Sequence, residues 1–305
     1  SSSLSSPIQL RLVMRPANEM AYVMVDPPAD GFTQTSPPGR AFLDGMEIQV
    51  GVIGGESNVA LQAAEFAKLA ASMERAGIVP APPIERLPDI VPASELPPSV
   101  DGHPTLGLWD ETLAPIGFAT TGTFLVTGPP MSGKTTTVAT MIRSIVAVRP
   151  AVQLVYLGQR RSPLTTAASW HSTANGPADI ATLAFDLQTK IAESEPGSWV
   201  VVVEGVGDLL NTECDVAVQD LLKACRGSEQ FVIAEGETST VTGSWPLLQA
   251  VKVSRAGIAL QPDQMDGDTL FKTSFPRLVR ADFPPGRGLL VGGGKALRVQ
   301  VALPE

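Results

Sequence analysis

The stretch Phe124-Leu125-Val126-Thr127-Gly128-Pro129-Pro130-Met131-Ser132-Gly133-Lys134-Thr135 decides the fold of this chain. Its last eight residues satisfy the pattern G-x-x-x-x-G-K-[ST], which is typical of a phosphate-binding loop. An apolar run at residues 124–126 leads into the loop, and a helix-forming segment at residues 136–148 leads out of it. Because this chemistry requires a strand, a loop and a helix in that order, the match predicts a nucleotide site in an α/β domain.

Each residue type in the loop has a physical role toward a triphosphate. Backbone N–H groups and the positive end of the following helix converge on the β-phosphate, and Gly133 permits a close approach of the backbone. We expect the Lys134 ammonium to reach the β- and γ-phosphates, the Thr135 hydroxyl to bind Mg²⁺, and Thr136 to donate to the α-phosphate. The predicted site for ATP and Mg²⁺ consists of Gly128, Pro129, Pro130, Met131, Ser132, Gly133, Lys134, Thr135 and Thr136.

Hydrolysis at such a loop also needs carboxylates beside the phosphates. The apolar run Trp199–Val203 ends in Glu204-Gly205. We assign Glu204 as the catalytic residue and as a Mg²⁺ ligand through water, whereas Gly205 supplies no second carboxylate to polarise an attacking water. Asp208 is a candidate substitute from the following turn. The sequence therefore predicts nucleotide binding with weak or absent hydrolysis.

Charged residues near the other strand ends leave two interpretations open. Glu235 and Glu237 stand either where a γ-phosphate sensor belongs, or at a helix cap or in a solvated loop. Arg160, Arg161 and Arg255 are either arginine fingers that act on a neighbouring site or ordinary surface charges. The two histidines lie in polar loops and are given no catalytic or metal role.

From residue 105 onward, strand and helix signals alternate, as they do in a mostly parallel sheet that is covered on both faces. We predict a leading strand or hairpin at 105–116, strands at 123–127, 153–157, 199–203, 231–234 and 257–260, and helices at 133–148, 178–193, 212–226 and 245–251. This order predicts an α/β fold of the RecA-like P-loop NTPase type with a mostly parallel central sheet.

Two copies of Pro-Pro-Gly-Arg begin similar stretches, one at Pro37 and one at Pro284, 247 residues apart. Each is a turn followed by a β-hairpin that ends in Gln-Val, and the separation is the length of one α/β module. We interpret residues 1–82 as the tail of a preceding ATPase module with a connecting helix at 57–76, and residues 83–305 as a P-loop ATPase domain. The alternative is two unrelated hairpins that share a turn sequence.

Composition narrows the classes of function. With 22 basic and 31 acidic residues the net charge is −9, which disfavours DNA as a partner. Cys214 and Cys225 have no metal-ligand spacing and indicate reduced thiols in a cytoplasmic compartment. No apolar run is long enough to cross a bilayer, so we expect membrane association only through a segment outside this chain. The proline-rich residues 79–100 predict an ordered linker on a surface.

Several stretches together resemble one known family. They are the P-loop with the preceding Pro115-Ile116-Gly117-Phe118, the linker Ala-Pro-Pro-Ile-Glu-Arg-Leu-Pro from Ala81, the strand Arg-Ala-Gly-Ile-Ala-Leu-Gln-Pro from Arg255, and the closing Pro-Pro-Gly-Arg-Gly from Pro284. The chain resembles the FtsK/SpoIIIE ATPases, in particular the tandem-ATPase branch of the type VII (ESX-like) secretion motors of actinobacteria. The resemblance extends from about residue 10 to the end.

This resemblance implies a RecA-like module that faces the cytoplasm in a membrane-anchored motor. It implies neighbouring ATPase modules or subunits as partners, together with a small secreted helical-hairpin protein of the WXG type. Residues 128–135 match the family's Walker A motif, and Glu204 stands at its Walker B aspartate. The Glu204-Gly205 pair departs from the family pattern and argues against full turnover. The rival functions are an ATP-driven DNA translocase and a non-hydrolysing structural or regulatory nucleotide-binding module.

Overall fold

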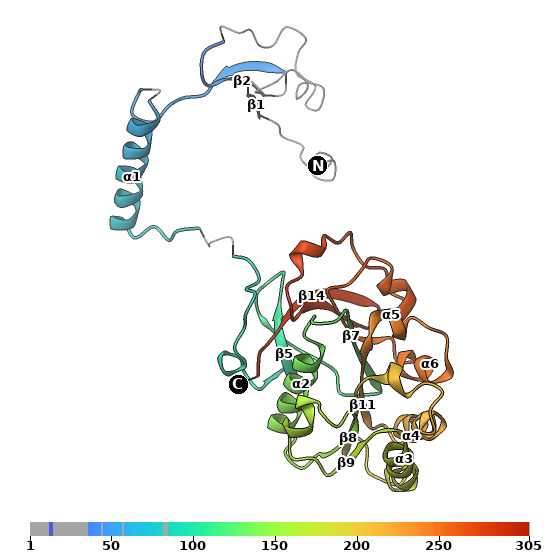
Figure 1. Ribbon diagram of the computed structural model, residues 1–305. Helices are drawn as coiled ribbons and strands as arrows, with labels where there is room; N and C mark the ends of the chain where they lie inside the picture. The colour runs from blue at the N-terminus through green and yellow to red at the C-terminus, as the bar shows by residue number, and fades with distance from the viewer. Residues whose placement is uncertain (1–11, 15–35, 44, 57, 82–84, 305) are drawn as a thin grey trace. The chain divides into compact units, whose positions relative to one another are not determined.

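The computed structural model describes residues 12–14, 36–43, 45–56, 58–81 and 85–304. The chain divides into two compact units, Ser1–Pro83 and Ile84–Glu305 (Figure 1). The interpretation of the first unit as the tail of a preceding ATPase module stays a prediction.

The first unit contains a small antiparallel sheet. Strand β1 (Leu12–Met14) pairs with β2 (Arg40–Leu43), and β2 pairs with β3 (Met46–Gln49). Strands β2 and β3 confirm the hairpin predicted at residues 37–50, whereas β1 was not predicted because it is only three residues long.

The connecting helix is also confirmed, as α1 (Val59–Arg75). Its first turn is fixed by Asn58, whose side-chain oxygen accepts from the N–H groups of Ala60 and Leu61 at 2.9 and 3.2 Å. Apolar residues recur along the helix, yet none of its side chains is buried. The helix therefore presents apolar surface that the described part of the first unit does not cover.

Within the described residues 85–304, the second unit is built on a mixed sheet of eleven strands. The strands are β4 (Ser99–Val100), β5 (His103–Trp109), β6 (Pro115–Gly117), β7 (Thr123–Gly128), β8 (Gln153–Gly158), β9 (Ser172–Asn175), β10 (Trp199–Val203), β11 (Phe231–Glu237), β12 (Ala256–Leu260), β13 (Arg287–Gly292) and β14 (Lys295–Val301). Their order is β4-β5-β14-β13-β12-β7-β11-β10-β8-β9, with β6 on β5. The six strands from β12 to β9 are parallel, and the rest are antiparallel.

Helices cover both faces of this sheet (Figure 1). They are α2 (Lys134–Val148), α3 (Pro177–Ala192), α4 (Asp215–Gly227), the short α5 (Thr238–Val241) and α6 (Pro246–Lys252). Alternate residues of β7 point to opposite faces, so Phe124 and Val126 pack with α2 while Leu125 packs with the core under α3, α4 and α6. The predicted α/β fold with a mostly parallel central sheet is confirmed, and each predicted strand and helix is present to within a few residues.

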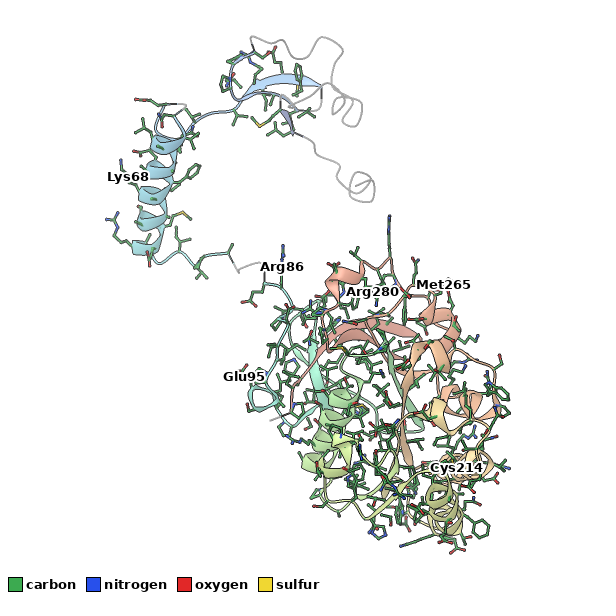
Figure 2. All side chains as sticks on the ribbon, viewed as in Figure 1. Lys68, Arg86, Glu95, Cys214, Met265 and Arg280 are labelled. Atoms are coloured by element: carbon green, nitrogen blue, oxygen red, sulfur yellow. The ribbon has the colours of Figure 1, made fainter. Side chains whose placement is uncertain are left out.

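The linker is held on the surface of the second unit. Leu87 and Val91 are buried, and Leu303 exchanges backbone hydrogen bonds with Val91 and Ala93 at 2.8 and 3.0 Å. The prediction of an ordered linker is confirmed for residues 85–100. Cys214, labelled in Figure 2, and Cys225 are free and buried. In the part of the chain that the structure describes, no helix is both long enough and apolar enough to cross a bilayer.

Candidate nucleotide-binding site

The predicted phosphate loop joins β7 to α2 at the carboxyl edge of the parallel strands. Gly133, with a φ of 97°, stands directly before the helix, and no side chain caps that helix. The Thr137 N–H donates to the Gly133 carbonyl at 2.8 Å, so the amides of Lys134, Thr135 and Thr136 lack a helical acceptor. Unpaired N–H groups at the positive end of a helix are suited to phosphate oxygens. The loop therefore fits a polyphosphate.

Lys134 lies inside the site and contacts a carboxylate. Its Nζ donates to the Pro129 carbonyl at 3.1 Å and lies 3.7 Å from Oε1 of Glu235, and both charged side chains are about nine-tenths buried. The other oxygen of Glu235 accepts from the Gly205 N–H at 3.0 Å. The pair holds Lys134 over the loop.

The surroundings of Glu235 disfavour its ionised form. Burial raises the pKa of this carboxyl, although the Gly205 N–H and the Lys134 ammonium oppose the shift, and the charges of Glu204 and Asp208 add to it. Burial excludes a solvated loop for Glu235, and its role as a γ-phosphate sensor stays a prediction. By contrast Glu237 is exposed, and its side chain makes no capping hydrogen bond.

Glu204 follows β10 and is 8% exposed. One carboxylate oxygen accepts from the Tyr156 hydroxyl and the other accepts from Ser162 Oγ at 2.8 Å. Burial, together with this bond to Glu204, raises the pKa of the Tyr156 hydroxyl. Since each carboxylate oxygen has a second lone pair, Glu204 retains capacity to accept from a Mg²⁺-bound water. Its catalytic and metal roles stay predictions.

The third carboxylate near Gly205 belongs to Asp208, which is exposed and accepts from Gln159 Nε2 at 2.9 Å. Among the described residues, no group of three or more His, Cys, Asp or Glu side chains has the geometry to hold a metal ion. Mg²⁺ at a phosphate loop takes most of its ligands from water and phosphate, so this finding is compatible with Thr135 as its protein ligand. Thr135 is partly exposed at the start of α2.

The closing Pro-Pro-Gly-Arg segment contacts the phosphate loop, and the sequence did not predict this contact. The Gly286 N–H donates to the Ser132 carbonyl at 2.8 Å. The next residue, Arg287, is 9% exposed and donates to the carbonyls of Leu87 and Pro88 and to the Asp89 carboxylate at 2.8–2.9 Å. One turn therefore holds both the phosphate loop and the linker. The Pro-Pro-Gly-Arg repeat is visible in the sequence, but the repeat does not indicate that its second copy lies beside the phosphate loop.

A recess of about 400 Å³ adjoins the loop at Pro129 and Pro130. It is lined also by Thr238, Ser239, Thr242, Gln261, Asp263, Asp266 and Arg280, the last labelled in Figure 2. The Thr238 hydroxyl lies 3.0 Å from that of Thr127 and so connects the recess to the end of β7. No sequence motif marks this recess.

The candidate arginine fingers do not contact the loop of their own chain. Arg160 pairs with Asp179 at 3.6 Å, and Arg161 is exposed. Arg255 is exposed directly before β12, at the amino edge of the sheet. An action on a neighbouring site stays a prediction. The His171 ring packs edge-on against Trp199, with ring centroids 5.1 Å apart.

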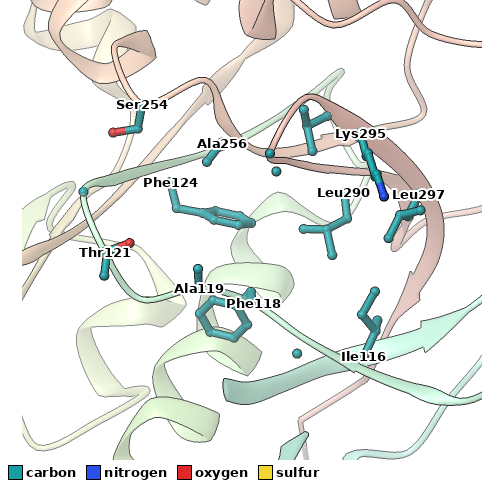
Figure 3. A pocket seen from close by; sticks show the side chains of 15 residues that line it. Ile116, Phe118, Ala119, Thr121, Phe124, Ser254, Ala256, Leu290, Lys295 and Leu297 are labelled. Carbon is teal, nitrogen blue, oxygen red and sulfur yellow. The ribbon is translucent and has the colours of Figure 1, made fainter. Parts of the chain in front are cut away.

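A second cavity, of about 460 Å³, opens at the other end of β7 (Figure 3). Phe118, Phe124, Leu290 and Leu297 give it an apolar lining, and Lys295 stands among the labelled residues of the β13–β14 hairpin. The strand β7 thus has an apolar cavity at its start and the phosphate loop at its end.

No protein-family model and no curated protein sequence matches this chain. Solved structures do match. The chain is similar to ATPases 2 and 3 of Thermomonospora curvata EccC in complex with a signal sequence peptide, with a TM-score of 0.65, 20% identity, and coverage of 88% of this chain and 54% of that one. It is also similar to the cytoplasmic domain of the T. curvata type VII secretion ATPase EccC (TM-score 0.63, 20% identity, 83% and 33% covered).

ATPases 2 and 3 of EssC from Geobacillus thermodenitrificans give a TM-score of 0.61 at 19% identity, with 94% of this chain and 59% of that one covered. The chain spans about half the length of the first of these structures. At this identity the likeness shows the fold, which is that of the RecA-like P-loop ATPases.

Proposed function

We propose that this chain is an ATP-binding module of a membrane-associated secretion motor of the type VII kind. It binds ATP and Mg²⁺ at Gly128–Thr135, hydrolyses ATP weakly or not at all, and engages a secreted protein. The observation that supports this most directly is the uncapped start of α2 after Gly133, with the buried Lys134 ammonium above it. This is a site for a polyanion within an ATPase fold.

In this proposal each residue has a separate task. The amides at the start of α2 bind the β-phosphate, and Lys134 exchanges Pro129 and Glu235 for phosphate oxygens. Thr135 and a water on Glu204 hold Mg²⁺. The recess beside Pro129 offers space that adjoins the phosphates.

Weak hydrolysis is supported by two features of the carboxylates. Gly205 follows Glu204 where a second acid would polarise water, and Asp208 is turned to Gln159. Glu235 places a carboxylate beside Lys134, so a γ-phosphate meets a group of like charge and binds less tightly. The missing second acid at Gly205 and the pairing of Asp208 with Gln159 are therefore the two features that favour a bound nucleotide over a reacting one.

The cavity at the start of β7 is the part of the chain that we propose for the secreted protein. Its apolar lining suits apolar side chains of a small helical hairpin of the WXG type. The EccC structure to which this chain is similar holds a signal sequence peptide, which supports the substrate class. Neighbouring ATPase modules and a membrane anchor outside these residues complete the proposed motor, with this chain in the cytoplasm.

The proposal is tested with the wild-type chain in three measurements. A fluorescent ATP analogue with Mg²⁺ should bind at micromolar concentrations, ATP turnover should be slow and unchanged by DNA, and a purified WXG-type helical-hairpin protein should bind. Turnover stimulated by DNA would instead favour a DNA translocase. Thermal stabilisation by ATP without binding of the hairpin protein would favour a structural or regulatory module, and absence of analogue binding would refute all three.

A further inference from the structure

The closing hairpin of the second unit has a defined set of hydrogen bonds. The Arg287 N–H donates to Pro284 at 3.0 Å, and the Val301 N–H donates to Gly286 at 2.9 Å. Gln300 is paired in register with Arg287, and its Nε2 donates to the Pro285 carbonyl at 3.2 Å. The hairpin thus closes back on its own Pro-Pro-Gly-Arg turn.

The hairpin of the first unit repeats every one of these contacts. The Arg40 N–H donates to Pro37 at 3.2 Å, and the Val50 N–H donates to Gly39 at 2.8 Å. Gln49 is paired in register with Arg40, and its Nε2 donates to the Pro38 carbonyl at 2.9 Å.

The glycine of each turn adopts the same left-handed conformation. Gly39 has a φ of 83° and Gly286 a φ of 79°, and a Cβ on either would approach the paired glutamine Nε2 to 2.8 Å. A shared turn sequence would explain the turns alone. Gln49 makes the same contact with its own turn as Gln300 does, and Val50 the same as Val301. These residues lie at the far end of hairpins of different length, so their agreement indicates that one structural part is used twice.

The two hairpins differ in what they contact. In the second unit, Gly286 donates to the phosphate loop and Arg287 donates to linker carbonyls and to Asp89. In the first unit, the Gly39 N–H meets no acceptor among the described residues. Nε of Arg40 is buried without a hydrogen-bond partner, although another nitrogen of this guanidinium pairs with Glu47.

We propose that residues 37–50 are the closing hairpin of a second P-loop module and dock on its phosphate loop. The Gly39 N–H donates to the loop carbonyl equivalent to that of Ser132, and Arg40 binds carbonyls of the linker that precedes that module. The partner is an ATPase module with the fold of the second unit here. The inference rests on the proposed function only in taking the partner's loop to be one that binds ATP.

The partner loop does not lie within residues 1–305. Residues 1–83 contain no G-x-x-x-x-G-K-[ST] sequence, and the loop at 128–135 already accepts the Gly286 amide. The same contact exists in every copy of this chain, so a second copy has no vacant loop unless its own hairpin is displaced. The partner is therefore a module from another polypeptide segment or subunit.

A fusion protein tests this directly. Residues 51–283 are joined to residues 37–305, so that the first of two P-loops can be closed only by the hairpin 37–50. The matched control joins 51–305 to 51–305, in which each loop keeps its own hairpin. Amide exchange at Gly39 should slow at least about tenfold in the fusion relative to the unfused chain. The fusion should also bind two molecules of a fluorescent ATP analogue.

Arg40→Ala should lower the thermal midpoint of the fusion and leave that of the unfused chain unchanged. Fast exchange at Gly39, or an unfolded first module, beside a folded control would overturn the inference. Slow exchange at Gly39 without analogue binding at either loop would support the inference and refute the proposed function. The two proposals are therefore separately testable.

Discussion

The two edges of the parallel strands have opposite chemistry, although one strand connects them. At the carboxyl edge β7 ends in the phosphate loop, beside Lys134, Glu204 and Glu235. At the amino edge β7 begins at the apolar cavity that includes Phe124. Parallel strands bring helix N-termini, with their unpaired donors, to the carboxyl edge only. The amino edge lacks these unpaired donors and the positive ends of the helix dipoles, so it can remain apolar and suit a different ligand.

The largest effect is expected from a substitution that removes nucleotide binding at the carboxyl edge and leaves the amino edge unchanged. Lys134→Ala removes the ammonium that faces the phosphates, so affinity for a fluorescent ATP analogue should fall about 1,000-fold, or about 4 kcal/mol. Binding of the helical-hairpin protein should be unchanged. Lys223→Ala, an exposed lysine of α4, is the control. Equal loss of both ligands would show that the edges are not independent.

A second substitution tests the turn at residues 284–287, which holds the phosphate loop and the linker. Arg287→Ala leaves the carbonyls of Leu87 and Pro88 without their donor, and we expect a loss of about 2–4 kcal/mol in the free energy of unfolding. Urea denaturation followed by tryptophan fluorescence measures this. Arg277→Ala, at an exposed arginine, should cost less than about 0.5 kcal/mol. Similar values for the two variants would contradict the role of Arg287.

The amino edge is tested by Leu297→Asp, which places a charge in the apolar cavity. We expect affinity for the helical-hairpin protein to fall about tenfold, or about 1.4 kcal/mol, with ATP binding unchanged. Titration calorimetry measures both ligands. Val279→Asp, at an exposed apolar residue that does not line the cavity, is the matched control. Undiminished hairpin binding by Leu297→Asp would exclude this cavity as the site.

A smaller effect is expected from Glu235→Gln, which keeps an acceptor for the Gly205 N–H and removes the charge beside Lys134. Affinity for the ATP analogue should rise about fivefold, or about 1 kcal/mol, because the γ-phosphate no longer meets a like charge. Glu237→Gln, at an exposed glutamate, should have no effect. A weakened affinity in Glu235→Gln would mean that this carboxylate assists binding.

The smallest expected effect is on stability and depends on pH. Burial raises the folded-state pKa of Glu235 above its ordinary value of 4.5, so the folded state binds the proton more tightly than the unfolded state. The wild type should therefore lose stability relative to Glu235→Gln as pH rises above 4.5 through the folded pKa, and the difference should then level off. Thermal midpoints of the two proteins, measured across this pH range, should show a relative loss of a few degrees for the wild type. A wild type that instead gains stability relative to Glu235→Gln with rising pH would mean that the folded-state pKa of Glu235 is lowered.

Local pattern was enough to predict most of the second unit. The valine run at Trp199–Val203 and the apolar run at Phe124–Val126 are fully buried strands, and such runs are recognised without knowledge of their neighbours. Strand β9 was missed because Ser-Thr-Ala-Asn has no apolar periodicity. The phosphate loop was predicted because its whole signal lies in eight consecutive residues.

Contacts across the fold were harder to predict. Glu235 reaches Lys134 because β11 lies between β7 and β10 in the sheet, although it follows both in the chain. Gly286 meets Ser132 after more than 150 residues of intervening chain. Such pairs depend on strand order, which no local pattern encodes.

The contact between Lys134 and Glu235 has a consequence for the heat of nucleotide binding. When the ammonium moves to the triphosphate, Glu235 loses its nearest counter-charge and faces an anion instead, so it takes up a proton from solution. That proton comes from the buffer. The calorimetric enthalpy of ATP binding near the carboxyl's titration range should therefore vary with the ionisation enthalpy of the buffer, and in Glu235→Gln this uptake of protons should be smaller.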